Sequence, residues 1–320
     1  MLNRQAPIRS GFGPRTTAQE VLKGQDLSGK TAIVTGGHSG LGLETTRALA
    51  SVGARVIVGA RSLVPAREVV GHIKGVETWE LDLSDLSSVR RFADAFLDLG
   101  RRADIVVNSA GVMACPETRV GPGWEAQFAT NHLGHYALVN LLWPALEEGA
   151  RVVAVSSAGH HYSAIRWDDV QFEGGYDKWL AYGQSKTANA LFAVHLDAIG
   201  RSRGIRAFSL HPGSIMTPLQ RHIPLEEMIA LGWADEAGNP AHPEVLKTPE
   251  QGAATQVWAA TSPQLDGMGG LYCEDCDIAS MAAADGNTLI GVRTHAIDPD
   301  QAQRLWALSA ELTGINAFSA

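Results

Sequence analysis

The chain has 320 residues, 45% of them apolar and 19% charged, which is the balance of a globular protein with a substantial core. Its net charge of −8 provides no positive field for nucleic acid or for an anionic membrane surface. No run reaches the roughly 18 apolar residues that a membrane span needs, and the N-terminus has no apolar segment typical of a signal peptide. Three cysteines suit a reducing compartment, so we expect a cytoplasmic protein.

Residues 1–28 are expected to form an N-terminal extension, in which Thr17 and Glu20 have the spacing of a helix capping box. From residue 29 onward, predicted strands and helices alternate to residue 213. The strands, each taken with the residues at its carboxyl end, are predicted within 31–37, 54–61, 76–84, 103–111, 150–159 and 204–213, and the helices at 41–54, 64–73, 86–100, 124–148 and 178–200. This alternation predicts one α/β domain over 29–320, with a parallel sheet of about seven strands covered by helices on both faces.

A glycine-rich turn follows the first strand, with Gly36, Gly40 and Gly42 spaced as GxxxGxG. Glycines at the start of a helix allow a tight turn whose N–H groups bind phosphate. After the second strand stands Arg61, where an acidic residue would accept bonds from an adenosine ribose. A guanidinium suits a 2′-phosphate instead, so we predict NADP(H), with NAD(H) as the alternative if Arg61 is only a solvated loop residue.

Two further residues lie four positions apart in the predicted helix 178–200. Tyr182 and Lys186 would share one helical face. Asp82 follows the third strand, where it could contact an adenine or simply cap a turn. Ser157 follows the fifth strand, so it belongs to the same end of the sheet as the glycine-rich turn.

These motifs together resemble the short-chain dehydrogenase/reductase family, whose Rossmann-type fold matches the predicted sheet. The matching segments are TGGHSGLG at 35–42, Asp82, NSAG at 108–111, Asn131 within TNHLGHY, Ser157, YGQSK at 182–186 and PGSIMT at 212–217. NSAG departs mildly from the usual NNAG, and the segment from Ser157 to Tyr182 is longer than in most members. The chain resembles the branch of retinol-dehydrogenase-like enzymes and the WW-domain oxidoreductase. Lacking a hydrophobic N-terminal anchor, it looks like the soluble bacterial relatives of that branch.

The resemblance implies a carbonyl–alcohol oxidoreductase with four catalytic residues. Tyr182 would donate or accept the proton, Lys186 would bind the nicotinamide ribose and lower the phenol pKa, Ser157 would bond the substrate oxygen, and Asn131 would hold a water beside Lys186. One ammonium about 4 Å away at an effective dielectric of about 20 contributes about 4 kcal/mol, enough to move a phenol from about 10 to about 7.

The implied cofactor-binding residues follow the ends of the strands. They are Gly36, His38, Ser39, Gly40, Leu41, Gly42, Arg61, Asp82, Leu83, Asn108, Ala110, Gly111, Tyr182, Lys186, Pro212, Gly213, Ile215 and Thr217. Thr217 could instead only cap the following turn.

Residues 216–250 are expected to form the substrate lid. Met216, Met228 and Trp233 would make an apolar wall, which favours a hydrophobic ketone or alcohol as the small-molecule substrate. His160 could line the same pocket or lie on a loop.

The same sequence bears on other functions and on assembly. No metal site is predicted, because neither the His132–His135 pair nor Cys273 and Cys276 has evident further ligands. A catalytically silent NADP-binding regulator is the alternative function, and a sugar-nucleotide epimerase is disfavoured by GxxxGxG. A homodimer or homotetramer through helices 124–148 and 178–200 is expected, as in many relatives.

Overall fold

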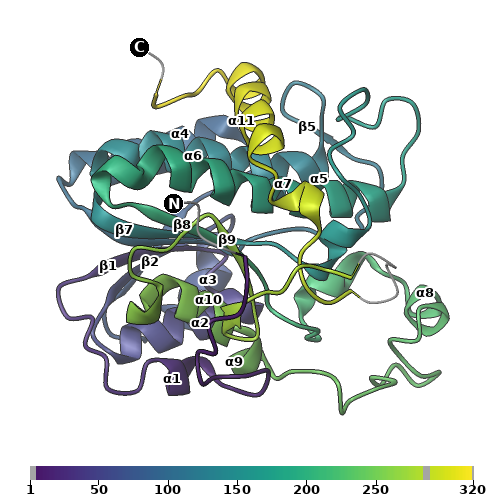
Figure 1. Cartoon of the computed structure of the whole chain (residues 1–320), viewed down its shortest axis with the longest axis horizontal. Helices are drawn as coiled ribbons and strands as arrows, with labels where there is room; N and C mark the ends of the chain where they lie inside the picture. The colour runs from purple at the N-terminus through teal and green to yellow at the C-terminus, as the bar shows by residue number, and fades with distance from the viewer. Residues whose placement is uncertain (1–4, 284–288, 319–320) are drawn as a thin grey trace.

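The computed structural model describes residues 5–283 and 289–318, which are built around an eight-stranded sheet of order β10-β9-β8-β7-β4-β1-β2-β3 (Figure 1). The strands are β1 (Thr31–Thr35), β2 (Arg55–Ala60), β3 (Val76–Glu80), β4 (Ala103–Asn108), β7 (Leu146–Val155), β8 (Arg206–His211), β9 (Leu271–Glu274) and β10 (Asp277–Ile278). All neighbouring pairs are parallel except β9 with β10. The predicted α/β fold with a doubly wound parallel sheet is confirmed, and a short antiparallel edge strand is added to it.

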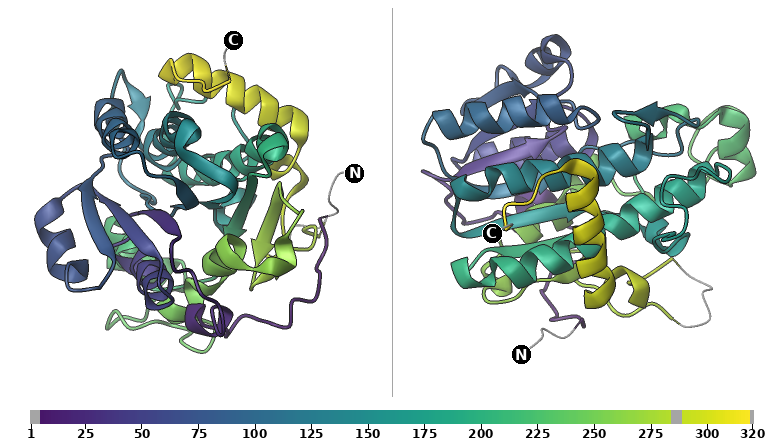
Figure 2. Two further views of the ribbon diagram at one scale, coloured as in Figure 1. Left: turned by 90° about the vertical axis from the view of Figure 1, so that its left-hand side faces the viewer. Right: turned by 90° about the horizontal axis from the view of Figure 1, so that it is seen from above.

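Helices cover both faces of this sheet (Figures 1 and 2). On one face lie α1 (Ala18–Val21), α2 (Gly40–Ser51), α3 (Leu63–Val70), α9 (Pro249–Gly252) and α10 (Ala254–Thr261); on the other lie α4 (Leu86–Asp98), α6 (Gly134–Leu142) and α7 (Lys178–Gly200). Neighbouring residues of one strand face opposite sides, so Val34 joins the first core and Ile33 the second. This two-sided burial explains why the strands are continuously apolar.

The parallel register brings the carboxyl ends of the strands to one edge of the sheet. Thr35 at the end of β1 pairs with Gly59 of β2, and Val155 at the end of β7 pairs with Leu210 of β8. The segments that follow these strands therefore lie side by side, as ligand sites of such sheets require.

The predicted helix at 124–148 is wrong at both ends. It begins as the hairpin of β5 (Arg119–Val120) and β6 (Trp124–Glu125), continues through a single helical turn, α5 (Ala126–Phe128), and a π-helical turn, Ala129–Leu133, and becomes α6. Pro144 lies in a 3₁₀ turn directly after α6, because proline lacks the N–H that would continue an α-helix. The chain is already in β7 at Leu146.

The last third of the chain forms elements that the sequence did not predict. Besides α9 and α10 they include the β9–β10 hairpin, which contains the Cys273–Cys276 motif. Asp275 and Cys276 at its tip have φ of 52° and 60°, the left-handed geometry of a tight hairpin turn. Both thiols are buried and free, and burial raises the pKa of Cys276 to about 12, so this motif builds a turn. In the described part of the chain no group of three or more histidine, cysteine or acidic side chains is arranged to hold a metal ion.

The C-terminal helix α11 (Pro299–Thr313) lies across α6 and α7 (Figure 2). Trp306 of α11 stacks on Phe192 at 5.8 Å between ring centroids and meets Tyr136 edge-on at 4.8 Å. The two helices expected to form a contact between subunits are thus covered by a helix of the same chain.

Within the described residues, the N-terminal extension is packed on the domain and follows the edge of the sheet (Figure 2). Gln5 bonds three backbone groups at Tyr272 and Ala279, and the Asp277 carboxylate accepts the backbone N–H groups of Ile8 to Ser10. The capping box of Thr17 and Glu20 is confirmed at α1. Residues 1–4 of the predicted extension lie outside the described range. The arm covers an edge that would otherwise present unpaired backbone groups.

Candidate active site

A cavity of about 730 Å³ opens where the strands end, and most of the residues singled out in the sequence line it. The predicted residues on its wall are Gly36, His38, Ser39, Gly40, Leu41, Gly42, Arg61, Asp82, Leu83, Ala110, Gly111, Ser157, Tyr182, Lys186, Pro212, Gly213, Ile215, Met216, Thr217 and Trp233. Asn108, Asn131, His160 and Met228 were predicted for the site but do not line the cavity.

The glycine-rich turn between β1 and α2 forms one side of the cavity. Gly36 has φ of +66°, and a Cβ on Gly42 would lie 2.5 Å from the Gly36 carbonyl oxygen, so the tight turn excludes side chains at both positions. The turn leads into the N-terminus of α2, where free N–H groups and the helix dipole favour an anion. His38 lines the same wall, and its Nδ1 is buried without a partner in the protein. A phosphate group fits this set of unfilled donors.

The turn after β4 packs directly against the glycine-rich turn. The Thr35 hydroxyl accepts the backbone N–H groups of Ser109 and Ala110, both at 3.0 Å. A Cβ on Gly36 would lie 3.1 Å from the Ala110 Cα. Asn108 points elsewhere: it is buried, and neither atom of its amide finds a hydrogen-bond partner in the described chain. Small residues at 109–111 thus leave space for a flat ligand.

Arg61 follows β2 and Asp82 follows β3, the two strands at the opposite end of the sheet from β8. Arg61 is exposed and comes directly after Ala60, the last residue of β2. The Asp82 carboxylate accepts from both the backbone and the hydroxyl of Ser84, at 2.9 and 2.6 Å. Asp82 therefore does cap its own turn, and it also lines the cavity.

Tyr182 and Lys186 come from the buried first half of α7, which Asp177 caps by accepting two backbone N–H groups. Each side chain of the pair is only 4% exposed. The Lys186 ammonium donates to the Val155 carbonyl at 3.0 Å and lies 5.6 Å from the centroid of the Tyr182 ring. Ser157 follows β7, and the hydrogen bond of its side chain to Tyr182 favours the ionised phenol. The structure therefore brings the hydroxyl, phenol and ammonium groups together.

The pKa of the phenol departs from the expectation. Burial raises the pKa of Tyr182 to about 12, against a smaller lowering by the Ser157 hydrogen bond. Burial also lowers the pKa of Lys186 to about 8, because both groups resist becoming or staying charged in a dry site. The protein by itself therefore keeps the phenol protonated, ready to donate, and the expected lowering toward neutrality is not produced by Lys186 alone.

Asn131 uses its side chain to hold the loop after β4. Its amide oxygen accepts the Val112 N–H at 2.8 Å, and its amide nitrogen donates to the Val112 carbonyl and to the Ser185 hydroxyl, both at 2.9 Å. A Cβ on Gly111 would lie 3.0 Å from this amide oxygen and 3.7 Å from the Lys186 Nζ. Both protons of the Asn131 amide are thus used within the protein.

The predicted lid closes the cavity from one side. It contains a 3₁₀ turn, Pro218–His222, and α8 (Leu225–Ala230). Thr217 caps the 3₁₀ turn and also lines the cavity, 3.5 Å from the position of a Cβ on Gly40, so both expected roles are compatible. The Trp233 ring contacts Trp179 at 5.7 Å between centroids.

Trp179 is a cavity residue that the sequence did not single out. It lies three residues before Tyr182 on the same helix, which is the signal that could have identified it. Glu227 of α8 accepts its indole N–H at 3.0 Å and forms an ion pair with Lys178. Tyr162 lies 6.3 Å away, between ring centroids, and completes an aromatic wall with Trp179 and Trp233. Met228 packs behind this wall.

His160 lies behind Ser157, outside the cavity. Its ring is fully buried, bonds the Ser157 carbonyl at 2.7 Å and accepts the Arg293 N–H at 3.1 Å. Burial lowers its pKa to about 3, so it stays neutral. Its two nitrogens are taken by the protein, which leaves none for a substrate.

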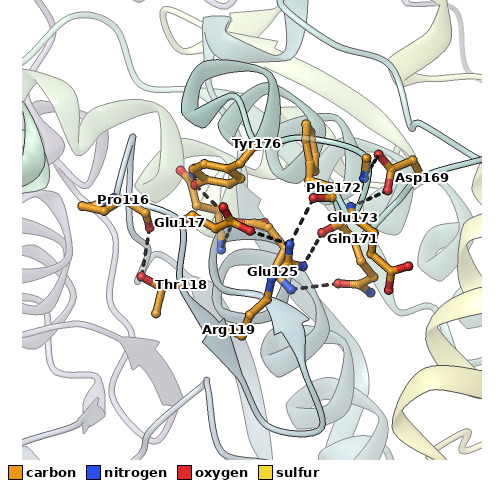
Figure 3. A network of polar contacts seen from close by, with 12 residues as sticks. Pro116, Glu117, Thr118, Arg119, Glu125, Asp169, Gln171, Phe172, Glu173 and Tyr176 are labelled. Atoms are coloured by element: carbon orange, nitrogen blue, oxygen red, sulfur yellow. Dashed lines mark hydrogen bonds and ion pairs between the residues drawn. The ribbon is translucent and has the colours of Figure 1, made fainter.

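The long segment between Ser157 and Tyr182 is tied to the chain at 115–127 (Figure 3). The Tyr176 hydroxyl donates to the Cys115 carbonyl and accepts from the Gln127 amide, both at 2.9 Å, and the Glu125 N–H donates to the Gln171 side chain at 2.8 Å. These contacts hold the segment just before the start of α7, and with it the position of Tyr182.

Known proteins resemble this chain over most of its length. The family model of the short chain dehydrogenase matches residues 30–227. A probable oxidoreductase of Streptomyces lividans is 45% identical, over 89% of this chain and 98% of its own, and retinol dehydrogenase 14 of Homo sapiens is 34% identical, over 96% and 93%. The crystal structure of a putative uncharacterized protein from Mycobacterium paratuberculosis matches 91% of this chain and 96% of its own, with 35% identity and a TM-score of 0.70.

Proposed function

We propose that the chain, which belongs to the short-chain dehydrogenase/reductase family, interconverts a hydrophobic alcohol and its carbonyl compound with NADP(H). Membership of this family makes it an NAD(P)-dependent oxidoreductase acting on CH–OH groups. The observation that carries the proposal is the meeting of Ser157, Tyr182 and Lys186 on the wall of a cavity that also contains the glycine-rich turn.

In the proposed reduction, Tyr182 donates its proton to the substrate oxygen and Ser157 holds that oxygen by a hydrogen bond. When bound, the dinucleotide supplies the hydride. Lys186 is a cation below its pKa of about 8 and stabilises the phenolate that proton transfer leaves behind. The raised pKa of Tyr182 favours the donor direction in the protein alone.

The NADP(H) preference is supported by Arg61. It lines the cavity directly after β2, in the position where an acidic residue would repel a 2′-phosphate. A hydrophobic substrate is supported by the wall of Tyr162, Trp179 and Trp233 beside Tyr182, which offers aromatic surface and few charges.

Among the residues that the structure describes, no helix has the length and apolar character needed to cross a bilayer.

The test uses NADPH, a panel of apolar ketones and aldehydes, and two matched variants. Tyr182→Phe should keep NADPH binding, measured by fluorescence, and lose turnover by a factor on the order of 10² or more, because the proton donor is gone. Tyr162→Phe removes another phenol of the same cavity and should leave turnover nearly unchanged. Turnover that survives in Tyr182→Phe would refute the mechanism, and NADPH binding without turnover of any carbonyl would favour the regulator.

A further inference from the structure

The imidazole of His135 joins three parts of the candidate site. Its Nε2 is 2.8 Å from the hydroxyl of Thr35, and its Nδ1 is 2.9 Å from the main-chain carbonyl of Asn131. Thr35 is the last residue of β1 before the glycine-rich turn, and Asn131 lies in the π-helical turn beside Lys186. The ring is 2% exposed and does not line the cavity, so it can act on a ligand only through these neighbours.

The hydrogen bonds around His135 determine which ring nitrogen carries the proton. A carbonyl oxygen cannot donate, so Nδ1 must be the donor to Asn131. The Thr35 oxygen already accepts the N–H groups of Ser109 and Ala110, so its own proton is directed to the unprotonated Nε2. Only the neutral Nδ1–H tautomer satisfies the four bonds together. Burial and the charge of Lys186 lower the pKa of His135 to about 4, consistent with a neutral ring.

We propose that His135 is a positioning residue for the dinucleotide cavity: it holds the Thr35 hydroxyl, and through it the turn at Ser109 and Ala110, in register with the carbonyl of Asn131. The inference rests on the proposed function, since that cavity is where the cofactor binds. The tolerance of this region is small, because a Cβ on Gly36 would lie only 3.1 Å from Ala110. Without the imidazole, the Thr35 proton loses its acceptor and the hydroxyl can rotate away from the two N–H groups.

His132 provides a matched control on the same stretch of helix. It is 1% exposed, its pKa is likewise lowered by burial, to about 3, and its Nε2 is 2.7 Å from the Ser309 hydroxyl of α11. His132 therefore has the same size, burial and neutral state as His135, but its hydrogen bond leads to the C-terminal helix and away from the cavity. Replacing either histidine costs core packing, whereas only one replacement disturbs the cavity.

The experiment measures NADPH affinity by fluorescence and thermal unfolding for His135→Ala, His132→Ala, Thr35→Val and the double variant His135→Ala/Thr35→Val. Both histidine variants should lower the Tm to a similar extent. Only His135→Ala and Thr35→Val should weaken NADPH binding, by about tenfold or more. The double variant should bind NADPH little more weakly than the single variant with the lower affinity, because both substitutions break the same series of hydrogen bonds.

A conservative variant separates the two halves of the network. In this chain Asn140 donates its side-chain amide to the carbonyl of Tyr136, four residues earlier, at 2.9 Å. An asparagine in His135→Asn can make the same bond to Asn131 but offers Thr35 no ring nitrogen, so its NADPH affinity should fall between those of the wild type and His135→Ala.

Equal NADPH affinities in His135→Ala and His132→Ala would overturn the inference, since the histidine would then be only a core residue. If His135→Ala does not fold, wild-type affinity in the near-isosteric Thr35→Val would overturn it in the same way. A wild-type protein that binds neither NADPH nor NADH would instead refute the proposed function, and this inference with it.

Discussion

At the scale of single residues, burial controls the protonation of the two titratable groups of the site. Lys186 and Tyr182 are both buried, which moves their pKa values apart, to about 8 for Lys186 and about 12 for Tyr182. Gly159 permits this arrangement, because a Cβ there would lie 2.7 Å from the Tyr182 ring. The protonation states of Tyr182 and Lys186 thus depend on packing as much as on their spacing of four residues along the helix.

Arg61 carries the prediction on cofactor choice. Arg61→Ala should weaken NADPH binding by about 10- to 100-fold, because a hydrogen bond to a charged group contributes about 1.5–3 kcal/mol, and should leave NADH binding unchanged. Arg55, exposed at the other end of the same strand, is the control: Arg55→Ala should affect neither dinucleotide. Fluorescence titration with both cofactors measures the two affinities. An unchanged ratio of NADPH to NADH affinity in Arg61→Ala would show that Arg61 does not select the cofactor.

At the scale of elements, the predicted lid is joined to the start of α7. Glu227 of α8 bonds the Trp179 indole and pairs with Lys178, one turn before Tyr182. The other end of the lid is held by Lys247, which donates to the Pro212 carbonyl at 3.2 Å and to Asp275 at 2.5 Å. Residues 216–250 are therefore connected both to the segment that follows β8, at Pro212, and to the aromatic wall.

Loss of the Glu227 latch should change substrate binding more than stability. Glu227→Ala leaves the Trp179 N–H without its acceptor, so KM for the best carbonyl substrate should rise several-fold. The partly exposed ion pair contributes only about 0–1 kcal/mol, so the Tm should hardly move. The neighbouring exposed Glu226→Ala is the control. A KM equal to that of the wild type would show that the latch does not shape the pocket.

At the scale of the whole molecule, the helices that were expected to contact a second subunit are buried within one chain. Nearly every residue of α6 and of the first half of α7 is buried within one chain, with α11 across them (Figure 2). The arm of Gln5 to Ser10 covers the sheet edge at β10. The faces through which the sequence analysis expected a dimer are therefore occupied.

We accordingly expect a monomer in solution at micromolar concentration. Light scattering should give a mass near 34 kDa. A dimer would contradict this expectation. If Trp306→Ala, which loosens the packing of α11 on α7, then altered the stability of the dimer, α11 itself would form the contact.

Four buried histidines should make the fold sensitive to acid. His132, His135, His160 and His211 have pKa values lowered by burial to about 3 or 4. Below about pH 6.5 the unfolded chain binds protons that the native chain excludes. The free energy of unfolding therefore has its full value above that pH and decreases as the pH falls toward 4. Glu125 and Glu274, whose pKa values are raised by burial, act in the opposite direction but are two groups against four.

Thermal unfolding at pH 7.5, 6 and 5 should therefore show a falling Tm, with proton uptake on unfolding at the two lower values. Replacing exposed His72 by glutamine should not change this trend. A Tm that stays level from pH 7.5 to 5 would contradict the burial of these rings.

The sequence by itself determined the features that depend on neighbouring residues. Apolar runs predicted six strands, the glycine-rich turn was placed correctly after the first, and helix 178–200 was predicted to the residue, because local backbone preferences and periodicity decide such elements. Most of the site residues predicted from the sequence line the cavity, since parallel strands bring their carboxyl ends to one edge.

Only the tertiary structure decided what depends on distant partners. The burial of His160 behind Ser157, the packing of α11 on α7 and the bond from Trp179 to Glu227 all join residues far apart in the chain. The same is true of the pKa of Tyr182, which was expected to fall and instead rises, because desolvation is set by everything packed around the ring and cannot be read from the spacing to Lys186.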